Sequence, residues 1–190
     1  MQEVIKKNFS EHLDVINKVL GSNSDSIDLF GNLLTTCLEN DGTIFWCGNG
    51  GSASDSQHIS AELVGRFKKD RRALRSIALT TDTSILTSVG NDYGFEEIFS
   101  RQFEALGTSR DILVGISTSG NSENIIRAFK AAKGLGALTL LLTGKDGGKV
   151  KQISDHSLVV ESDSTARIQE AHILIGHILC DIIEQRLELV

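Results

Sequence analysis

Cysteine, positive charge and long apolar runs are all scarce in this sequence of 190 residues. No stretch approaches the roughly 18 consecutive apolar residues of a membrane span, and Met1 leads into a mixed segment rather than a signal-like one. Cys37, Cys47 and Cys180 are far apart and form no C-x-x-C pair, which argues against a disulfide framework and a zinc knuckle. We therefore expect a cytoplasmic protein with no membrane partner.

The balance of charge is acidic, with a formal net charge of -6. This disfavours a general nucleic-acid binder, because phosphate backbones are held by clustered Lys and Arg. One short basic run, at 68–72, is interpreted as a solvated loop rather than a binding patch. The length suits one domain, and no repeat, low-complexity tract or linker divides it, so residues 1–190 are predicted to form a single domain.

Hydrophobic periodicity changes at about residue 43. Before it, apolar residues recur at helical spacing on both sides of the break at 21–24, which predicts a helical hairpin over residues 1–40. After it, short β-rich runs alternate with helical segments, the pattern of an α/β fold with helices on both faces of a parallel sheet. The expected strands are 43–47, 76–79, 111–117, 137–143 and 156–161. The expected helices are 52–66, 95–106, 121–133 and 166 to near the C-terminus.

Two predicted strand-to-helix loops have the composition of phosphate sites. The first, 48–52, is rich in glycine and opens a helix, but an ordinary structural turn explains it equally well. The second, 117–122, offers several hydroxyls where an anion would meet a helix N-terminus. A helix cap needs only one hydroxyl, so the surplus favours a phosphate cup. Its hydroxyl residues are Ser117, Thr118, Ser119 and Ser122.

Two predicted helices carry candidate metal ligands. His58 and Glu62 are four residues apart and share a helix face, as metal ligands, as a positioned base or as a plain surface pair. Gln169 and His177 are eight apart, roughly 80° around the last helix, so both can face one pocket. This nitrogen and oxygen set suits Zn²⁺, although spacing alone leaves the metal a conjecture. His172 lies elsewhere on the wheel and fits a hydrogen-bonded interior or interface histidine better than a catalytic one.

Six motifs, in this order, cover nearly the whole chain: CGNGGS (47–52), HISAE (58–62), GNDYGF (90–95), GISTSGNS (115–122), LTGKDGG (142–148) and RIQEAHILIGH (167–177). With these motifs in this order, the chain resembles the sedoheptulose 7-phosphate isomerases of the sugar isomerase (SIS) domain superfamily. The resemblance implies a three-layer αβα sandwich with a five-stranded parallel sheet, and a homotetramer. It also implies a zinc-dependent conversion of sedoheptulose 7-phosphate to D-glycero-D-manno-heptose 7-phosphate in heptose biosynthesis.

The resemblance also assigns roles to residues. It implies that Glu62 and His177 are the catalytic acid/base pair. It also implies that each subunit binds one Zn²⁺ through His58, Glu62, Gln169 and His177. The substrate-binding positions become Asn49, Gly50, Gly51, Ser52, Glu62, Asn91, Asp92, Ser117, Thr118, Ser119, Ser122 and Gln169. One position departs from the family. This chain has Ala166, whereas some members have an aspartate just before the Arg-Ile-Gln run, which puts one secondary contact in doubt.

Two other functions compete with this one. A non-catalytic protein of the same superfamily, acting as a tetrameric regulator of a replication initiator, would lack the His/Glu/Gln/His set present here. An isomerase of another sugar phosphate would share the phosphate loops, because nothing in the sequence counts the carbons of the sugar. The enediol chemistry of an aldose-ketose isomerase needs a base at carbon, an acid at oxygen and stabilisation of negative charge, which Glu62, His177 and a Lewis-acidic metal would supply.

Overall fold

The computed structural model describes residues 1–189 and contains the predicted sheet. Its five parallel strands lie in the order β2-β1-β3-β4-β5. Each lies within a residue or two of a predicted strand, so the α/β prediction is confirmed. The strands are β1 (Ile44–Gly48), β2 (Ser76–Ala78), β3 (Ile112–Ser117), β4 (Leu138–Gly144) and β5 (His156–Val160).

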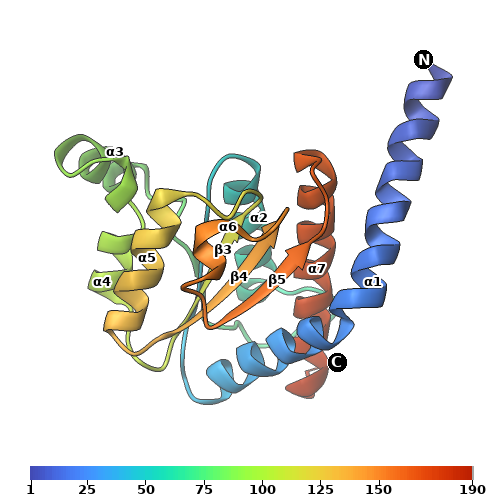
Figure 1. The fold of residues 1–190 in the computed structure, drawn as a ribbon. Helices are drawn as coiled ribbons and strands as arrows, with labels where there is room; N and C mark the ends of the chain where they lie inside the picture. The colour runs from blue at the N-terminus through green and yellow to red at the C-terminus, as the bar shows by residue number, and fades with distance from the viewer. Residues whose placement is uncertain (190) are drawn as a thin grey trace.

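Helices cover both faces of the sheet and make three layers (Figure 1). Side chains alternate along each strand: Trp46 packs with α1, α2 and α7, whereas Phe45 packs with α3, α4 and α5 on the opposite face. Both faces of the sheet are thus buried in apolar side chains, as a parallel sheet requires. The helices are α1 (Gln2–Glu39), α2 (Gly51–Val64), α3 (Thr83–Asp92), η1 (Phe95–Glu97), α4 (Ser100–Leu106), α5 (Glu123–Gly134), α6 (Gly148–Lys151) and α7 (Thr165–Arg186).

The predicted N-terminal hairpin is wrong, because α1 is one helix of 38 residues. The Ser22 and Ser24 hydroxyls each donate to the carbonyl four residues earlier, at 2.8 and 2.5 Å, which preserves the helical path. Asn23 is buried and its side chain donates to the Val159 carbonyl (3.2 Å), which ties this point to the sheet. Serine hydroxyls bonded in this way bend helices without ending them. Figure 1 shows the resulting change in direction along α1.

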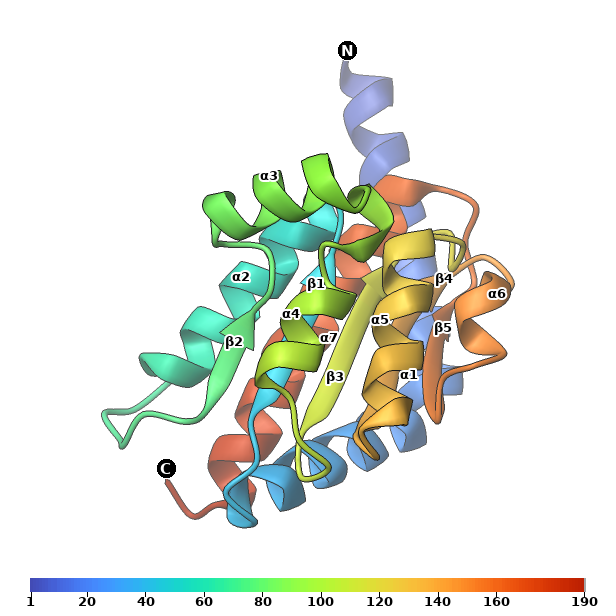
Figure 2. The ribbon, with the colours of Figure 1, turned by 90° about the vertical axis from the view of Figure 1, so that its left-hand side faces the viewer.

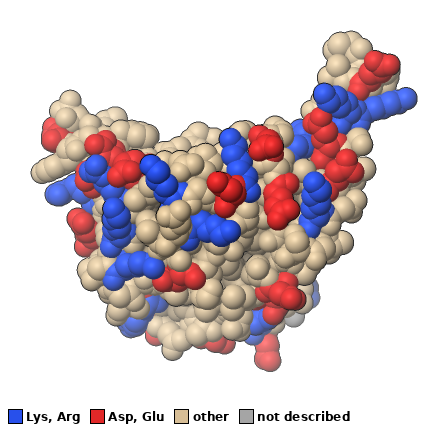
Figure 3. Space-filling model, in the orientation of Figure 1, with Lys and Arg blue, Asp and Glu red and all other residues tan. Residues whose placement is uncertain are grey.

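The basic run at 68–72 is not the uniformly solvated loop that the sequence predicts. The Arg71 side chain is only 2% exposed and pairs with Glu184, and Lys68 pairs with Asp181 across 2.5 Å. Elsewhere, Lys and Arg are interspersed with Asp and Glu on the face that Figure 3 shows. Among residues 1–189, no helix has both the length and the apolar character needed to cross a bilayer.

The topology places the ligand-binding edge of the sheet. β2 lies on one side of β1, and β3 lies on the other side. The helix after β1, α2, packs on one face of the sheet, whereas the helix after β3, α5, packs on the opposite face. Gly48 is in register with Ile116, and the two loops that begin there lie side by side. Open α/β sheets bind ligands at such a switch point, beyond the carboxyl ends of the strands. Figure 2 shows this edge with α2 and α5 leading away from it.

Candidate active site

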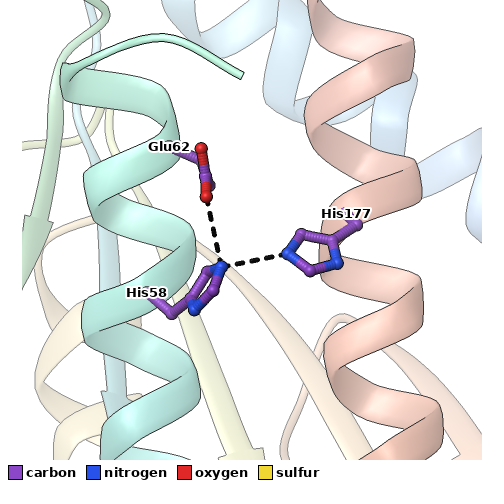
Figure 4. Close-up of side chains that lie close together, drawn as sticks. All are labelled: His58, Glu62 and His177. Carbon is purple, nitrogen blue, oxygen red and sulfur yellow. Dashed lines mark hydrogen bonds and ion pairs between the residues drawn. The ribbon is translucent and has the colours of Figure 1, made fainter. Parts of the chain in front are cut away.

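Three predicted metal ligands meet between two helices (Figure 4). His58 and Glu62 lie one turn apart on α2, with 3.2 Å between His58 Nε2 and Glu62 Oε1. His177 on α7 brings its Nε2 to 3.0 Å from His58 Nε2. One donor atom from each of the three side chains lies within 4.8 Å of the other two, so the structure confirms the juxtaposition that spacing alone left open.

The donor set of this cluster fits a divalent cation. The two Nε2 atoms face each other, so they either share one proton or turn both lone pairs toward a common positive charge. The Glu62 carboxylate adds an oxygen ligand on the same side. Two imidazoles and a carboxylate are the protein ligands of many catalytic zinc sites, where a further position stays open to substrate. A metal at this point would replace the shared proton and relieve the close approach of the two rings.

Close packing of α2 against α7 makes this meeting possible. A Cβ at Gly176 would lie 2.6 Å from the Ile59 side chain, so only glycine allows α2 to approach at this level. Gly176 directly precedes His177, and Ile59 directly follows His58. Phe67 then covers the outer side, with its ring stacked on His177 at 5.6 Å between centroids and 19° between planes. The local geometry therefore restricts where both imidazoles can lie.

Gln169 lies on α7 farther along its contact with α2. Its amide covers Gly51, where a Cβ would come within 2.4 Å of Gln169 Nε2. Gly51 precedes His58 by two helical turns, a rise of about 10 Å along α2. The structure therefore places Gln169 beside the first glycine loop, and its predicted role as fourth ligand stays a prediction.

The loop after β3 forms a cup of hydroxyl groups and amides. The Ser117 and Ser122 hydroxyls are 3.1 Å apart, and Ser117 Oγ also accepts from the Gly120 amide (3.1 Å). Ser119 Oγ accepts from the Asn121 amide (3.2 Å). Gly120 has φ +63°, and a Cβ there would meet the Gly147 carbonyl at 1.9 Å, so the turn requires glycine. Because α5 begins directly after Ser122, its N-terminal dipole faces the cup.

The loop after β1 is joined to this cup. The side chains of Asn49 and Asn124 exchange two hydrogen bonds, of 2.9 and 2.8 Å, between the first loop and the start of α5. Gly50 has φ +55° and precedes the first turn of α2, and Ser52 is buried inside that turn. The sequence did not single out Asn124; its only signal is a polar residue at a buried position of an amphipathic helix.

Asn91 and Asp92 lie apart from this group. They end α3, both are exposed, and the Asn91 side chain donates to Asp92 (2.7 Å). In Figure 1, α3 is on the opposite side of the sheet from α7. The structure therefore does not bring these two predicted substrate-binding residues to the histidine cluster within one chain.

Asp55 is a site residue that the sequence did not identify. It lies one turn before His58 on α2, and its Oδ2 is buried without a hydrogen-bond partner. Burial raises the pKa of Asp55 to about 6, and the nearby His58 opposes this rise. A carboxyl group that titrates close to neutrality at a ligand-binding edge can hold or release a proton during catalysis. The available signal was its spacing of three residues from His58.

His172 is structural, as its place on the helical wheel suggested. Its side chain is buried and Nε2 lies 3.1 Å from the Thr143 carbonyl, with Nδ1 buried and unpartnered. Burial lowers the pKa of His172 to about 4, and the Thr143 contact opposes this effect only in part. The ring is therefore neutral near pH 7 and donates from Nε2. Thr143 in turn donates to the Ser117 carbonyl (2.8 Å), so His172 is linked to the cup through Thr143.

Comparison with known proteins agrees with this geometry. The SIS domain family model matches residues 8–144. The chain is 54% identical to the phosphoheptose isomerase of Helicobacter pylori strain P12 over 97% of this chain and 96% of the relative. It is also 54% identical to phosphoheptose isomerase 1 of Campylobacter jejuni, over 97% and 99%. The structure of phosphoheptose isomerase GmhA from Neisseria gonorrhoeae superposes with a TM-score of 0.93 at 46% identity, covering 97% of this chain and 98% of that one.

Proposed function

Because the chain belongs to the phosphoheptose isomerases of the SIS domain family, we propose that it interconverts sedoheptulose 7-phosphate and D-glycero-D-manno-heptose 7-phosphate in heptose biosynthesis. One observation carries this proposal: the chain has both a cluster of His58, Glu62 and His177 on α2 and α7 and a hydroxyl-lined cup after β3. A regulatory protein that only binds a sugar phosphate needs the cup but not the cluster. The cluster therefore favours an enzyme over a non-catalytic relative.

Zn²⁺ is the metal that we assign to the cluster, one per subunit, with His58, Glu62 and His177 as ligands and Gln169 as the predicted fourth. Imidazole and carboxylate ligands in this number suit Zn²⁺ better than Mg²⁺ or Ca²⁺, which prefer oxygen alone. When bound, the ion would supply a Lewis acid that stabilises negative charge on the sugar oxygens. All three cysteines are buried, and none belongs to the cluster.

Glu62 and His177 are the groups that we assign to proton transfer. Isomerisation moves a hydrogen between C1 and C2 through a cis-enediol. Glu62 takes a proton from C1 with one carboxylate oxygen, and His177 protonates the C2 oxygen, which gives the enediol. Glu62 then returns the proton to C2, and the C1 hydroxyl gives its proton to His177, which leaves the aldose. A ring nitrogen that binds a metal has no proton to give, so the proton of His177 must come from Nδ1 when Nε2 is a ligand. General acid and base groups each contribute on the order of 10²–10⁴ in rate.

The phosphate of the substrate is assigned to the cup formed by Ser117, Thr118, Ser119 and Ser122. Hydroxyl groups, amides and the α5 dipole hold an anion there without a lysine or arginine in the loop. The sugar then lies along Asn49, Gly50, Gly51 and Ser52 toward Gln169, which covers Gly51. This direction leads from the cup toward the histidine cluster, so anchoring the phosphate orients the reacting carbons. Asn91 and Asp92 are assigned to further substrate contacts.

A cytoplasmic homotetramer is the assembly that we propose. The first half of α1 extends beyond the sheet and leaves apolar side chains in solvent, among them Phe9 (67% exposed) and Leu20 (68% exposed). Leu174 and Ile178 are also partly exposed beside a groove of about 400 Å³ between α1 and α7. Apolar surface of this extent is typical of subunit contacts. Light scattering at micromolar concentration should give a tetrameric mass, and a monomeric mass would contradict the assembly.

Direct assay tests the proposed function. Purified protein loaded with Zn²⁺ should convert sedoheptulose 7-phosphate to an aldose phosphate, followed by a reducing-sugar or chromatographic measurement. Sedoheptulose without the phosphate is the matched control and should react far more slowly, because it cannot occupy the cup. A loaded, folded protein that binds the sugar phosphate but forms no aldose would favour the regulatory alternative. Preference for a shorter sugar phosphate would favour the other isomerase.

A further inference from the structure

The structure contains a buried ion pair beside the histidine cluster that the reaction does not use directly. Arg71 Nε donates to Glu184 Oε1 across 2.8 Å, and the two side chains are 2% and 0% exposed. Glu184 also accepts from the backbone amides of Phe67 (3.0 Å) and Lys68 (3.1 Å). The carboxylate at the end of α7 therefore holds the loop that follows α2. We call this pair, with the bonds that it makes, the Arg71–Glu184 clasp.

The other end of the Arg71 guanidinium holds the last turn of α2. Nη2 donates to the Glu62 carbonyl (2.8 Å), and Nη1 donates to the carbonyls of Leu63 (2.8 Å) and Gly65 (3.1 Å). The last carbonyls of a helix have no partner within the helix, and a cation there is also favoured by the helix dipole. The clasp thus fixes the backbone of Glu62 itself.

The same clasp reaches His177 through Phe67. The Phe67 ring is stacked on the His177 imidazole, while the Phe67 amide is bonded to Glu184. His177 and Glu184 are seven residues apart on α7, which places them on the same helix face. Glu62 and His177, one on each helix, are therefore both tied to one buried pair. No other buried arginine–carboxylate pair within residues 1–189 touches the cluster in this way.

We infer that the Arg71–Glu184 clasp is a positioning device that fixes the separation of α2 and α7 at the cluster and so sets its affinity for metal. This inference rests on the proposed metal site. Stability alone is a weak reason for such a pair, because a buried ion pair often stabilises a fold no more than apolar residues of the same volume. Geometry is a better reason, since only the planar guanidinium bonds Glu184 and four backbone carbonyls at once, those of Glu62, Leu63, Gly65 and Arg72.

The test replaces Arg71 by lysine, which keeps the charge and removes the fork. We expect the Kd for Zn²⁺ of the metal-free protein, measured by competition with a chelating dye, to rise at least about tenfold, as for other groups that orient metal ligands. The absorption spectrum of the Co²⁺-substituted protein should also change, because it reports the geometry of the ligands. Arg186→Lys is the matched control: Arg186 joins α7 to Asp28 of α1 and does not contact the loop after α2.

A second variant keeps the inference testable if Arg71→Lys does not fold. Phe67→Leu leaves both Glu184 bonds to the backbone in place and removes only the ring on His177, so it should weaken Zn²⁺ binding severalfold. Wild-type Zn²⁺ affinity and a wild-type Co²⁺ spectrum in Phe67→Leu, and in Arg71→Lys where it folds, would overturn the inference, even if unfolding became easier. Failure of the wild-type protein to bind one Zn²⁺ would instead contradict the proposed metal site.

Discussion

The two halves of the candidate site are built in different ways. The histidine cluster consists of side chains on the long helices α2 and α7, and a buried ion pair fixes the backbone around it. The phosphate cup consists of a loop after β3, where hydroxyls and amides bond one another and glycine permits the turn. The cluster thus depends on tertiary packing, whereas the cup depends on local backbone geometry.

This difference follows from what each half has to do. Proton transfer and metal binding require side chains held within a fraction of an ångström, which rigid helices provide. A phosphate carries its charge on several oxygens and is recognised by many weak dipoles, which a loop at a helix N-terminus provides. Changes in the cluster should therefore affect turnover, and changes in the cup should affect binding.

The largest effect should come from removing the metal. Dialysis against a chelator should abolish turnover, and Zn²⁺ should restore it, because the bound ion would supply the Lewis acid that stabilises negative charge on the substrate oxygens. The metal-free protein should still bind inorganic phosphate in a calorimetric titration, since the cup contains no ligand of the cluster. A chelator already saturated with Zn²⁺ is the control. Full activity in a protein shown to contain no metal would refute the role of the cluster.

The next effect should come from Glu62→Gln. Glutamine keeps nearly the same shape and an oxygen ligand but cannot accept the carbon-bound proton, so kcat should fall by at least about 10²-fold. KM should change little, because the phosphate contacts remain. Exchange of solvent deuterium into the C1/C2 position should fall in parallel. A plain surface pair would be worth only about 0–1 kcal/mol and would leave activity intact. Isomerisation and exchange at wild-type rates would show that Glu62 is not the base and would assign that role to His177 or His172.

Sequence patterns predicted the sheet well because each strand is a short apolar run between polar breaks. They also located the hydroxyl-rich loop after β3, where the bonds among Ser117, Gly120 and Ser122 are local. They missed α3, because Ile85, Leu86 and Val89 are its only apolar side chains in ten residues otherwise rich in Thr, Ser and Gly, and only Val89 is buried. The hairpin prediction was wrong because glycine and two serines resemble a break. The bond from Asn23 to the sheet and the serine bonds to the preceding turn are not visible in the sequence.

The Arg71–Glu184 clasp was beyond sequence reasoning for a related reason. The two residues are 113 positions apart, and a single arginine in a basic run normally indicates a solvated loop. The one available signal was Glu184 itself, an acidic residue at a core-facing position of α7. Local patterns thus predict what the cup needs, whereas the parts that hold the cluster in place become visible only after α2 and α7 are packed together.

A moderate effect should follow from replacing Ser119 and Ser122 by alanine together. A hydroxyl bond to a charged phosphate is worth about 1.5–3 kcal/mol, so the loss of one such bond already raises KM at least about tenfold, while kcat at saturation changes less. Ser154→Ala is a matched control, because Ser154 lies just before β5, at the opposite edge of the sheet. An unchanged KM in the double variant would show that the phosphate binds elsewhere.

The smallest effect should appear only in acid and only in stability. The pKa of His172 is lowered by burial from 6.5 to about 4, so the unfolded chain takes up the proton first as the pH falls. Above about pH 6.5 the folded chain keeps its full stability. As the pH falls toward 4, the free energy of unfolding should decrease by roughly 3 kcal/mol. Urea unfolding of the metal-free protein from pH 7 to 4 measures this loss.

His172→Gln provides the comparison for this measurement. The glutamine amide can still donate to the Thr143 carbonyl but does not titrate, so the variant should lose less stability than the wild type over the same pH range. All other side chains are the same in both proteins, and the difference between the two curves therefore isolates His172. Because Thr143 connects His172 to Ser117, the pH-dependent loosening should start at the cup and leave the contacts of the clasp intact. Identical pH curves for the two proteins would show that His172 is not held neutral in the folded chain.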